Sequence, residues 1–433
     1  MKTVRIGLAG FGTVGSAVYR NLNREASLMF DRAGVRPEVA AIAVRNPKKH
    51  RGAKHFPSSL LVSRPRDLVD HPDVDVIVEV MGGCGVAREL ILASLRAGKP
   101  VVTANKALLA EHGREIFGES NSLNVPIYFE ASVAGGMPII QSLRQGLVAN
   151  RFPLIYGIVN GTSNYILTKM SEENLPFETV LSEAQALGYA EADPSFDIDG
   201  VDAAHKAAIL ASLAHGGCVD FKKVHIEGIR HISPVDVQFG HLLGYEIKLL
   251  AIIRSQSENE VEVRVHPTFI PRNNRLANTR GVTNAIVVRG HVVGDIKISG
   301  PGAGGDATSS AILSDIIEAA THLDPASNDR SPAYLCARGP QVMPIESVIS
   351  RYYLRLSVSD KPGVMAQISS VLGKARIGIS SVIQPEGHEG KVVPLIFMIH
   401  DAPYRAMNQA LKQIQRLQCV KAKPVMLRVE SFE

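Results

Sequence analysis

Two lysines stand in surroundings that are unusually apolar or small for a charged side chain. Lys106 follows a strand-like run in VVTANKALL, and Lys206 lies in the alanine-rich stretch GVDAAHKAAILASLAHGG. Asp202 precedes Lys206 by four positions and shares its helix face. Burying ionised groups is costly unless they are paired or used, and a positioned ammonium can stabilise and protonate an oxygen that gains negative charge. The pair is therefore a functional candidate, with an ordinary salt bridge on a half-exposed helix as the alternative.

The loop that leads into this helix is rich in carboxylates. Residues 188–200, GYAEADPSFDIDG, place Glu191, Asp193, Asp197 and Asp199 in a stretch bounded by Gly and Pro. Such a cluster is well suited to bind a substrate ammonium, although it could instead hold a metal or remain solvated. Its position favours the functional interpretation of Lys206.

A glycine motif near the N-terminus has the spacing of a dinucleotide-binding turn. It follows a strand-like run, opens a helix-compatible segment at 16–30, and consists of Gly10, Phe11, Gly12, Thr13, Val14 and Gly15. The first glycine permits a tight turn, the second lets a pyrophosphate approach the backbone, and the third lets helix and strand pack closely. A glycine-rich turn in a structural α/β domain is the alternative.

Arg45 lies where NAD-specific sites commonly carry Asp or Glu, at the end of the second strand. A planar cation suits the 2′-phosphate of NADP, and Lys48 and Lys49 are close in sequence. We therefore expect NADP as the cofactor, without excluding NAD. The spacing from Gly15 is longer than the usual ~20 residues, so an exposed loop charge is the alternative for Arg45.

The elements around these residues predict an α/β protein. Helical stretches at 86–97 and 107–120 alternate with strand-like runs at 4–9, 39–44, 74–81, 100–103 and 127–131. This alternation predicts a doubly wound parallel sheet of the Rossmann type, with Lys106 at its carboxyl edge. From about 150 to 300, helices such as 201–215 mix with strands such as 261–265 and 285–288, which predicts a mixed α/β domain.

The C-terminal part follows a helix at 307–322 and a polar, Pro-containing linker at 324–349. Its pattern is strand, helix, two strands, helix and strand, which predicts a split βαββαβ unit. The elements are expected at 352–358, 364–374, 377–383, 392–400, 402–417 and 420–428.

The bulk composition points away from nucleic acid and membranes. The chain has 433 residues, enough for two or three domains, and its 47 Lys and Arg exceed its 42 Asp and Glu by a net charge of only +5. Four separated cysteines form no CxxC pair, and neither a signal peptide nor an apolar span is evident. We expect a cytoplasmic protein that binds neither nucleic acid nor a membrane.

Seven stretches together resemble one known family, homoserine dehydrogenase, in its monofunctional form with an appended ACT domain. They are GFGTVG, TANK, EASVAGGMPII, NGTSNYIL, GYAEADPSFDIDGVDAAHK, GPGAGGDATSSAI and DKPGVMAQI. The resemblance covers essentially the whole chain, and the stretch from GYAEADP to DAAHK is its most distinctive part. It implies interconversion of aspartate 4-semialdehyde and homoserine with NADPH or NADH, in the biosynthesis of threonine, methionine and isoleucine.

The resemblance also implies roles for individual residues. Lys206 would be the proton donor and acceptor at the substrate oxygen, Asp202 would help to set up the site, and Lys106 would touch both substrate and cofactor. Glu191 would bind the substrate amino group. Further substrate-binding candidates are Tyr189, Asp197 and Thr162. For the NGTSN loop that holds Thr162, a purely structural helix cap is the alternative.

Two more loops receive roles from the same resemblance. Gly302 and Gly305 belong to a second glycine loop near the cofactor, for which a hinge between domains is the alternative. A sodium ion would bind mainly through backbone oxygens, because hard cations prefer oxygen ligands. Its candidate residues are Glu130, Val133, Gly135 and Met137.

The βαββαβ unit looks like an ACT domain, a ferredoxin-like module that commonly pairs and binds an amino acid. Asp360, Gly363 and Val364 are the effector candidates, and by the family's habit the effector would be threonine. A dimerisation module without a ligand is the alternative. Homodimers and homotetramers both fit the resemblance.

The domain boundaries that we expect are 1–130 for the dinucleotide-binding domain, 131–305 for the catalytic and dimerisation domain, 306–349 for a return helix and linker, and 350–433 for the regulatory domain. Two other functions remain open at this stage. One is a non-catalytic sensor of dinucleotide and amino acid. The other is a semialdehyde dehydrogenase that forms a thioester, for which Cys84 is the cysteine nearest the presumed cofactor edge.

Overall fold

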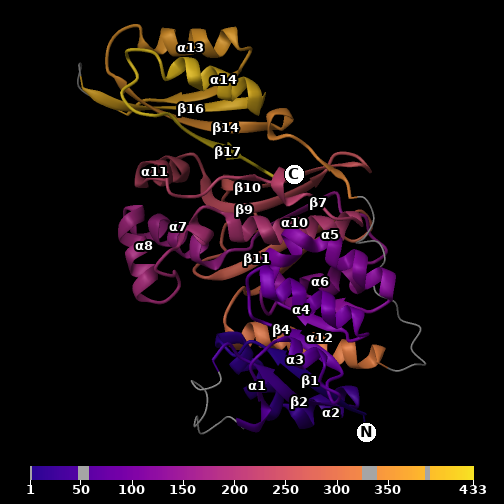
Figure 1. Ribbon diagram of the computed structural model, residues 1–433. Helices are drawn as coiled ribbons and strands as arrows, with labels where there is room; N and C mark the ends of the chain where they lie inside the picture. Colours follow the sequence, from indigo (N-terminus) through magenta and orange to yellow (C-terminus); the bar gives the residue numbers. More distant parts are fainter. Residues whose placement is uncertain (1, 47–57, 324–338, 386–390) are drawn as a thin grey trace.

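The computed structural model describes residues 2–46, 58–323, 339–385 and 391–433. Figure 1 shows three parts stacked along one direction, from the indigo N-terminal part through the magenta central part to the yellow C-terminal unit. The helix α12 (Gly305–His322) returns to the N-terminal part, as the sequence predicts. Lys48, Lys49 and most of the expected linker lie outside the described residues. Within the described ranges, no helix is long and apolar enough to cross a membrane.

The N-terminal part is the predicted parallel sheet. Its strands pair in the order β3-β2-β1-β4-β5-β6, all parallel. Their bounds are β1 (Lys2–Ala9), β2 (Val35–Ala43), β3 (Leu61–Val62), β4 (Val76–Glu79), β5 (Val101–Thr103) and β6 (Ile127–Tyr128). The strands are apolar on both sides because helices cover both faces of the sheet.

Different helices cover the two faces of this sheet. On one face, α1 (Thr13–Arg24) and α12 pack Leu22 and Ile316 against β1. On the other, α4 (Gly85–Arg96) and α5 (Lys106–Leu123) bury Ile91 and Leu108. The short helices are α2 (Ala26–Ala33) and α3 (Arg66–Val69).

Several expected elements differ from the structure in their bounds, such as the strand expected at 420–428, which is Val425–Val429, and two others differ in kind. The helix-compatible segment 16–30 is broken at Glu25, and α2, which follows the break, buries none of its residues. The expected strand 127–131 ends at Tyr128 and continues as a 3-10 turn, Glu130–Ser132. That turn lets the Glu130 carboxylate accept hydrogen bonds from the backbone N–H groups of Ile140 and Gln141, at 2.8 and 2.7 Å.

The central part is the expected mixed domain. Its strands are β7 (Leu154–Ile158), β8 (His225–Ile226), β9 (Tyr245–Ser255), β10 (Glu260–Pro271), β11 (Thr283–Gly290) and β12 (Gly294–Pro301). Its helices are α6 (Ile139–Gln141), α7 (Gly161–Glu173), α8 (Phe177–Ala186), α9 (Ser195–Ile198), α10 (Val201–His215) and α11 (Pro234–Leu242). The helix α10 packs against α5 as well as against β9 and β10. Small alanine side chains allow this close approach, and all residues from Asp202 to Leu213 are buried.

The C-terminal unit has the predicted βαββαβ order. It comprises β14 (Ile349–Ser359), α13 (Val364–Lys374), β15 (Ile379–Ile383), β16 (Val392–Pro403), α14 (Tyr404–Ile414) and β17 (Val425–Val429). Its strands pair in the order β17-β14-β16-β15, and its core includes Leu354, Ile368 and Met407.

The C-terminal unit is joined to the central part by strand pairing. The strand β17 lies parallel to β10, with Thr268 opposite Arg428 and Phe269 opposite Val429. Within the described residues the two parts therefore share one sheet, in the order β12-β11-β7-β9-β10-β17-β14-β16-β15. At the end of the expected linker, β13 (Gln341–Val342) also pairs with β10, so this part of the linker belongs to the central sheet.

Candidate active site

Asp202 connects the two candidate lysines. Its Oδ2 lies 2.7 Å from Lys206 Nζ, and its Oδ1 lies 2.7 Å from Lys106 Nζ. The three side chains come from two packed helices, because Lys106 opens α5 and the other two lie on α10. Asp202 and Lys206 are 2% and 6% exposed, which does not fit the alternative of a half-exposed surface salt bridge.

The ammonium of Lys206 is held in one orientation. Besides binding Asp202, it donates a hydrogen bond to the carbonyl oxygen of Val159 at 2.6 Å. An ammonium carries three N–H donors. Among the described residues these two acceptors account for two of them, so one donor remains for a ligand oxygen.

The pKa values of this pair are set by burial and by charge. Burial by itself would raise the pKa of Asp202, but the ammonium groups of Lys206 and Lys106 outweigh it and hold that pKa well below its usual range. Burial lowers the pKa of Lys206, and the Asp202 carboxylate opposes this shift. The lysine is thus shifted towards the range in which it can exchange a proton, as a general acid or base must.

Asn160 ties a second carboxylate to the first. Its amide nitrogen donates to Asp197 Oδ1 at 2.7 Å and to Asp202 Oδ2 at 2.8 Å. Its amide oxygen caps α7 by accepting from Ser163 N at 2.8 Å. Asn160 thus caps α7 with its amide oxygen, as the structural alternative predicts, while its amide nitrogen binds two carboxylates of the candidate site. Burial raises the pKa of Asp197, and the hydrogen bond from Asn160 opposes this.

The four substrate-binding candidates divide into two groups. Thr162 Oγ1 lies 3.2 Å from Asp197 Oδ2 and 2.7 Å from the carbonyl oxygen of Tyr189. The side chains of Thr162 and Asp197 therefore meet beside Asn160. The side chain of Tyr189 is 44% exposed and lies beside Tyr165. Glu191 is exposed, and its contact with Gln185 is made by its backbone oxygen. The carboxylate loop therefore brings Asp197, but not Glu191, next to the lysine pair.

The first glycine motif has the geometry that the sequence predicts. Gly10 has φ +103°, and a Cβ there would lie 2.7 Å from the carbonyl oxygen of Val80. A Cβ on Gly15 would lie 2.2 Å from the carbonyl oxygen of Gly10. A Cβ on Gly12 would meet nothing within 4 Å, and Gly12 precedes α1 without a side-chain cap. Open space in front of uncapped N–H groups fits a pyrophosphate.

The second glycine loop lies against the first. A Cβ on Gly305 would be 3.1 Å from the carbonyl oxygen of Thr13, and Asn21 Nδ2 donates to Asp306 at 2.9 Å. The helices α1 and α12 thus hold the two loops side by side. Arg45 is exposed two residues after β2, whose last residue, Ala43, accepts a hydrogen bond from Gly10 N at 3.0 Å.

One positioning residue escaped the sequence analysis. Glu79, the fully buried last residue of β4, accepts hydrogen bonds from Met81 N at 2.8 Å and from Thr103 Oγ1 at 2.7 Å. It therefore joins the turn after β4 to the end of β5, just before Lys106. The available signal is a charged residue inside a predicted strand, because the run VDVIVEV carries Asp75 and Glu79 among otherwise apolar residues.

Comparisons with known proteins agree with this geometry. The family model described as "Homoserine dehydrogenase" matches residues 138–317, and "Homoserine dehydrogenase, NAD binding domain" matches residues 10–130. The homoserine dehydrogenase of Pseudomonas aeruginosa is 42% identical over 100% of both chains, and that of Bacillus subtilis is 35% identical over 99% of both. The chain belongs to the homoserine dehydrogenase family. It is thus an NAD(P)-dependent oxidoreductase that acts on a CH–OH group.

Solved structures of homoserine dehydrogenases match all or most of the fold. The crystal structure from Thiobacillus denitrificans has a TM-score of 0.92 at 42% identity and covers 100% of this chain and 99% of that one. A hyperthermophilic archaeal homoserine dehydrogenase in complex with NADPH has a TM-score of 0.62 at 30% identity, covering 75% of this chain and 99% of its own. The family assignment confirms the predicted enzyme class. The non-catalytic sensor and the thioester-forming semialdehyde dehydrogenase were wrong alternatives.

Proposed function

We propose that this homoserine dehydrogenase interconverts homoserine and aspartate 4-semialdehyde with Lys206 as the acid and base. The observation that supports this most is the buried Asp202 carboxylate with one ammonium on each oxygen, at 2.7 Å. A buried charge persists only where it is compensated, and here the compensation is positioned at the junction of α5 and α10.

Each residue of this group has a distinct task in the proposed mechanism. Bound NADPH supplies a hydride to the substrate carbonyl carbon. Lys206 stabilises the negative charge that develops on the substrate oxygen and then protonates it, which yields the alcohol. In the reverse direction the neutral amine accepts that proton. Asp202 orients both ammonium groups, and Lys106, about a third of whose side chain is exposed, would touch both substrate and cofactor.

The proposed cofactor site combines both glycine loops. The backbone from Gly10 to Gly15, including Phe11, Thr13 and Val14, would hold the pyrophosphate, with Gly305 of the second glycine loop beside Thr13. Gly302 of the same loop packs against Asn284 and would support that loop near the cofactor. We propose NADP as the preferred cofactor because Arg45 stands beside the end of β2 as an exposed cation. A comparison of initial rates with NADPH and NADH tests this preference.

For the substrate amino group we propose Asp197 as the main anion, with Thr162 beside it. Asp197 lies close to Asp202 through Asn160, so it can bind an ammonium while the lysines bind oxygen. Glu191 and Tyr189 would contribute from the exposed edge of the same loop.

We keep a monovalent cation as a proposal for the loop after β6. Both oxygens of the Glu130 carboxylate already accept backbone N–H groups, and burial raises the pKa of Glu130 to about 7. A sodium ion there would therefore be held by backbone oxygens of Val133, Gly135 and Met137 rather than by that carboxylate.

The C-terminal unit is proposed to be an ACT domain that binds threonine between paired copies in a dimer or tetramer. Gly363 has φ +85° and caps α13, Asp360 Oδ1 accepts from Gln384 at 2.9 Å, and Val364 begins the helix. Threonine should lower the rate of homoserine oxidation if it binds there, since an effector acts by favouring one conformation.

The experiment for the mechanism is Lys206→Ala in the purified full-length chain. We expect kcat to fall about 10²–10⁴-fold, the usual contribution of a general acid or base. NADPH binding, followed by the change in its fluorescence, should persist. Lys412→Ala is the control because Lys412 is exposed on α14. Full turnover in the Lys206 variant would reject the assignment.

A further inference from the structure

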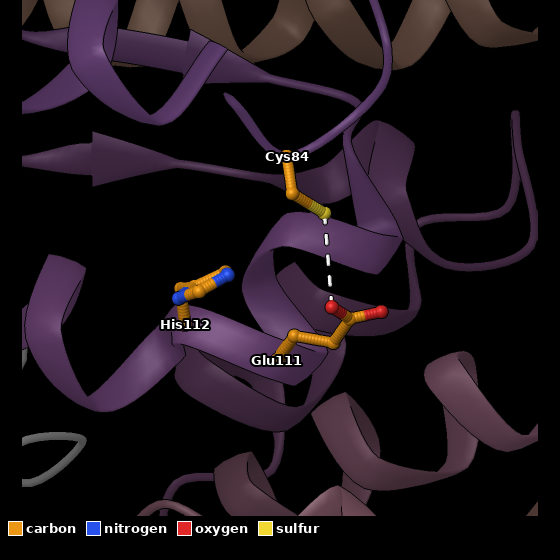
Figure 2. A group of neighbouring side chains, drawn as sticks. All are labelled: Cys84, Glu111 and His112. Atoms are coloured by element: carbon orange, nitrogen blue, oxygen red, sulfur yellow. Dashed lines mark hydrogen bonds between the residues drawn. The ribbon is translucent and has the colours of Figure 1, made fainter. Parts of the chain in front are cut away.

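Three side chains of metal-binding type gather beside the parallel sheet, outside the lysine pair. Cys84 lies in the turn between β4 and α4, and Glu111 and His112 lie on α5. One donor atom from each lies within 4.8 Å of the others. Figure 2 shows Cys84 Sγ facing the Glu111 carboxylate, 3.9 Å from its Oε2, with the His112 ring directed towards the same space.

A fourth donor approaches this group from α10. His205 is 2% exposed, and neither of its ring nitrogens has a hydrogen-bond partner among the described residues. Its Nε2 lies 3.5 Å from Glu111 Oε1, so one oxygen of this carboxylate faces the cysteine and the other faces the histidine. The ring is held by Phe221, with centroids 4.4 Å apart. A buried imidazole without a partner costs free energy, and a ligand would remove that cost.

We propose that a thiophilic divalent cation of the zinc type binds to Cys84, Glu111 and His112. His205, next to Glu111, is the fourth donor. Thiolate, imidazole and carboxylate are the ligands that Zn²⁺ takes, whereas Mg²⁺ and Ca²⁺ prefer oxygen alone. With bond lengths of ~2.0–2.3 Å, donors around one zinc ion lie roughly 3.3–3.7 Å apart. The 3.9 Å between Cys84 and Glu111 is already near this spacing. The thiol proton leaves to solvent when the metal binds.

The ion has a route to this site and a structural consequence there. Glu111 and His112 line a cavity of about 610 Å³ that also borders Phe221 and Cys218. The turn that carries Cys84 is already tied to the start of α5, since Asn105 Nδ2 donates to Gly83 O at 2.7 Å. A bound ion would therefore clamp that turn, α5 and α10 together.

Cobalt is the probe, because Co²⁺ occupies zinc sites and reports its ligands by absorption. The chelator-treated, full-length enzyme is titrated with Co²⁺, and its absorption and melting temperature are recorded. We expect saturable binding, a near-ultraviolet thiolate-to-cobalt band, the intense visible bands of a tetrahedral ion and a higher melting temperature. These readouts do not depend on turnover, so they stand apart from the proposed mechanism.

Substitutions locate the site. Cys84→Ser should remove the near-ultraviolet band, and His112→Ala should weaken Co²⁺ binding by at least about 10–100-fold, the usual loss for a residue that only orients a metal ligand. Cys218→Ser is the matched control, because this cysteine borders the same cavity and should leave the spectrum unchanged. The proposal is overturned by an absent thiolate band in the parent enzyme, by a band that survives Cys84→Ser, or by one that Cys218→Ser removes.

Discussion

Asp202 has an ammonium group on each of its two oxygens, so its charge influences the protonation of Lys206 directly. Burial lowers the pKa of Lys206, and the carboxylate opposes that shift. Removing the charge while keeping the shape, as in Asp202→Asn, should lower the pKa of Lys206 further. An opposite charge at this range typically shifts a pKa by ~1–3 units.

The lower pKa of Lys206 in Asp202→Asn predicts the direction in which the pH profile of each reaction should move. In the proposed mechanism, homoserine oxidation needs the neutral amine of Lys206 and its rate rises as pH passes the pKa of that amine. In Asp202→Asn the rising limb should therefore move to lower pH by ~1–3 units, with a lower plateau. In the proposed mechanism, reduction of aspartate 4-semialdehyde needs the ammonium of Lys206. In Asp202→Asn its rate should therefore begin to decline at a lower pH. Profiles of kcat in both directions measure this. Asp193→Asn is the control, because it alters an exposed carboxylate of the loop 188–200. It should leave the pH profiles of both reactions in place. A limb that moves to higher pH contradicts the assigned roles.

At the residue scale, residue types and spacing indicate the proposed reactive centre but not every partner of its residues. The i,i+4 relation of Asp202 and Lys206 is local, so the helix period alone predicts that they meet. The contact of Asp202 with Lys106 joins residues almost a hundred positions apart. Spacing also does not tell which carboxylate of a loop turns inward, which is why the exposure of Glu191 and the role of Glu79 could not be predicted.

At the element scale, the turn between β1 and α1 makes two glycines necessary for different reasons. At Gly15 a Cβ would collide with the backbone of Gly10 at 2.2 Å, whereas at Gly12 it would enter open space. Gly15→Ala should therefore destabilise the apo enzyme by about 1–3 kcal/mol through overpacking. Gly12→Ala should keep its stability and weaken NADPH binding about tenfold, or 1.4 kcal/mol, by obstructing the pyrophosphate.

Denaturant unfolding and NADPH titration separate these two effects. Gly118→Ala is the control, since a Cβ within α5 meets nothing there and alanine favours a helix. It should leave NADPH affinity unchanged and stability equal or slightly higher. Normal stability in Gly15→Ala, or unchanged NADPH affinity in Gly12→Ala, would contradict the geometry proposed for this turn.

Elements with strong local signals were predicted closely. The helices 201–215 and 364–374 have the expected bounds, because Gly200 and Gly216 cap the first at its two ends and Gly363 immediately precedes the second. The break at Glu25 was not predicted, since the segment 16–30 has helix-forming residues throughout. The two helices differ in burial, because the inner face of α1 packs on the sheet whereas α2 lies on the surface.

At the scale of the whole molecule, the shared sheet could not be predicted. The pairing of Thr268 with Arg428 joins strands 160 residues apart, and periodicity within each strand does not identify its partner. The strand β17 also places Arg428, 1% exposed, where its Nη1 donates to Glu227 at 2.9 Å. Close to Glu227 in the chain, Ile229 N donates to Ile198 O at 2.8 Å, next to Asp197. The C-terminal unit is thus connected through one ion pair and one short segment to residues 188–200, the proposed substrate loop.

This connection predicts a coupled effect of Arg428→Met. Removing the guanidinium leaves the Glu227 carboxylate, among the described residues, with only its contact to His225 Nε2, at 2.7 Å. We expect a loss of about 3 kcal/mol, the low end for a broken buried pair, because this contact remains and Glu227 keeps 25% of its side chain exposed. The KM for homoserine should rise while the affinity for NADPH stays constant, since Glu227 supports the substrate loop and not the glycine turn. Denaturant unfolding and steady-state kinetics measure both.

A double-mutant cycle distinguishes the ion pair from simple loss of packing. In Arg428→Met with Glu227→Gln no charge is left unpaired, so the double variant should be more stable than the sum of the two single losses predicts. Arg405→Met, an exposed arginine of the same unit, should change neither stability nor KM. Strictly additive losses, or a KM that is unaffected in Arg428→Met, would mean that the C-terminal unit is attached to the catalytic part without supporting its substrate loop.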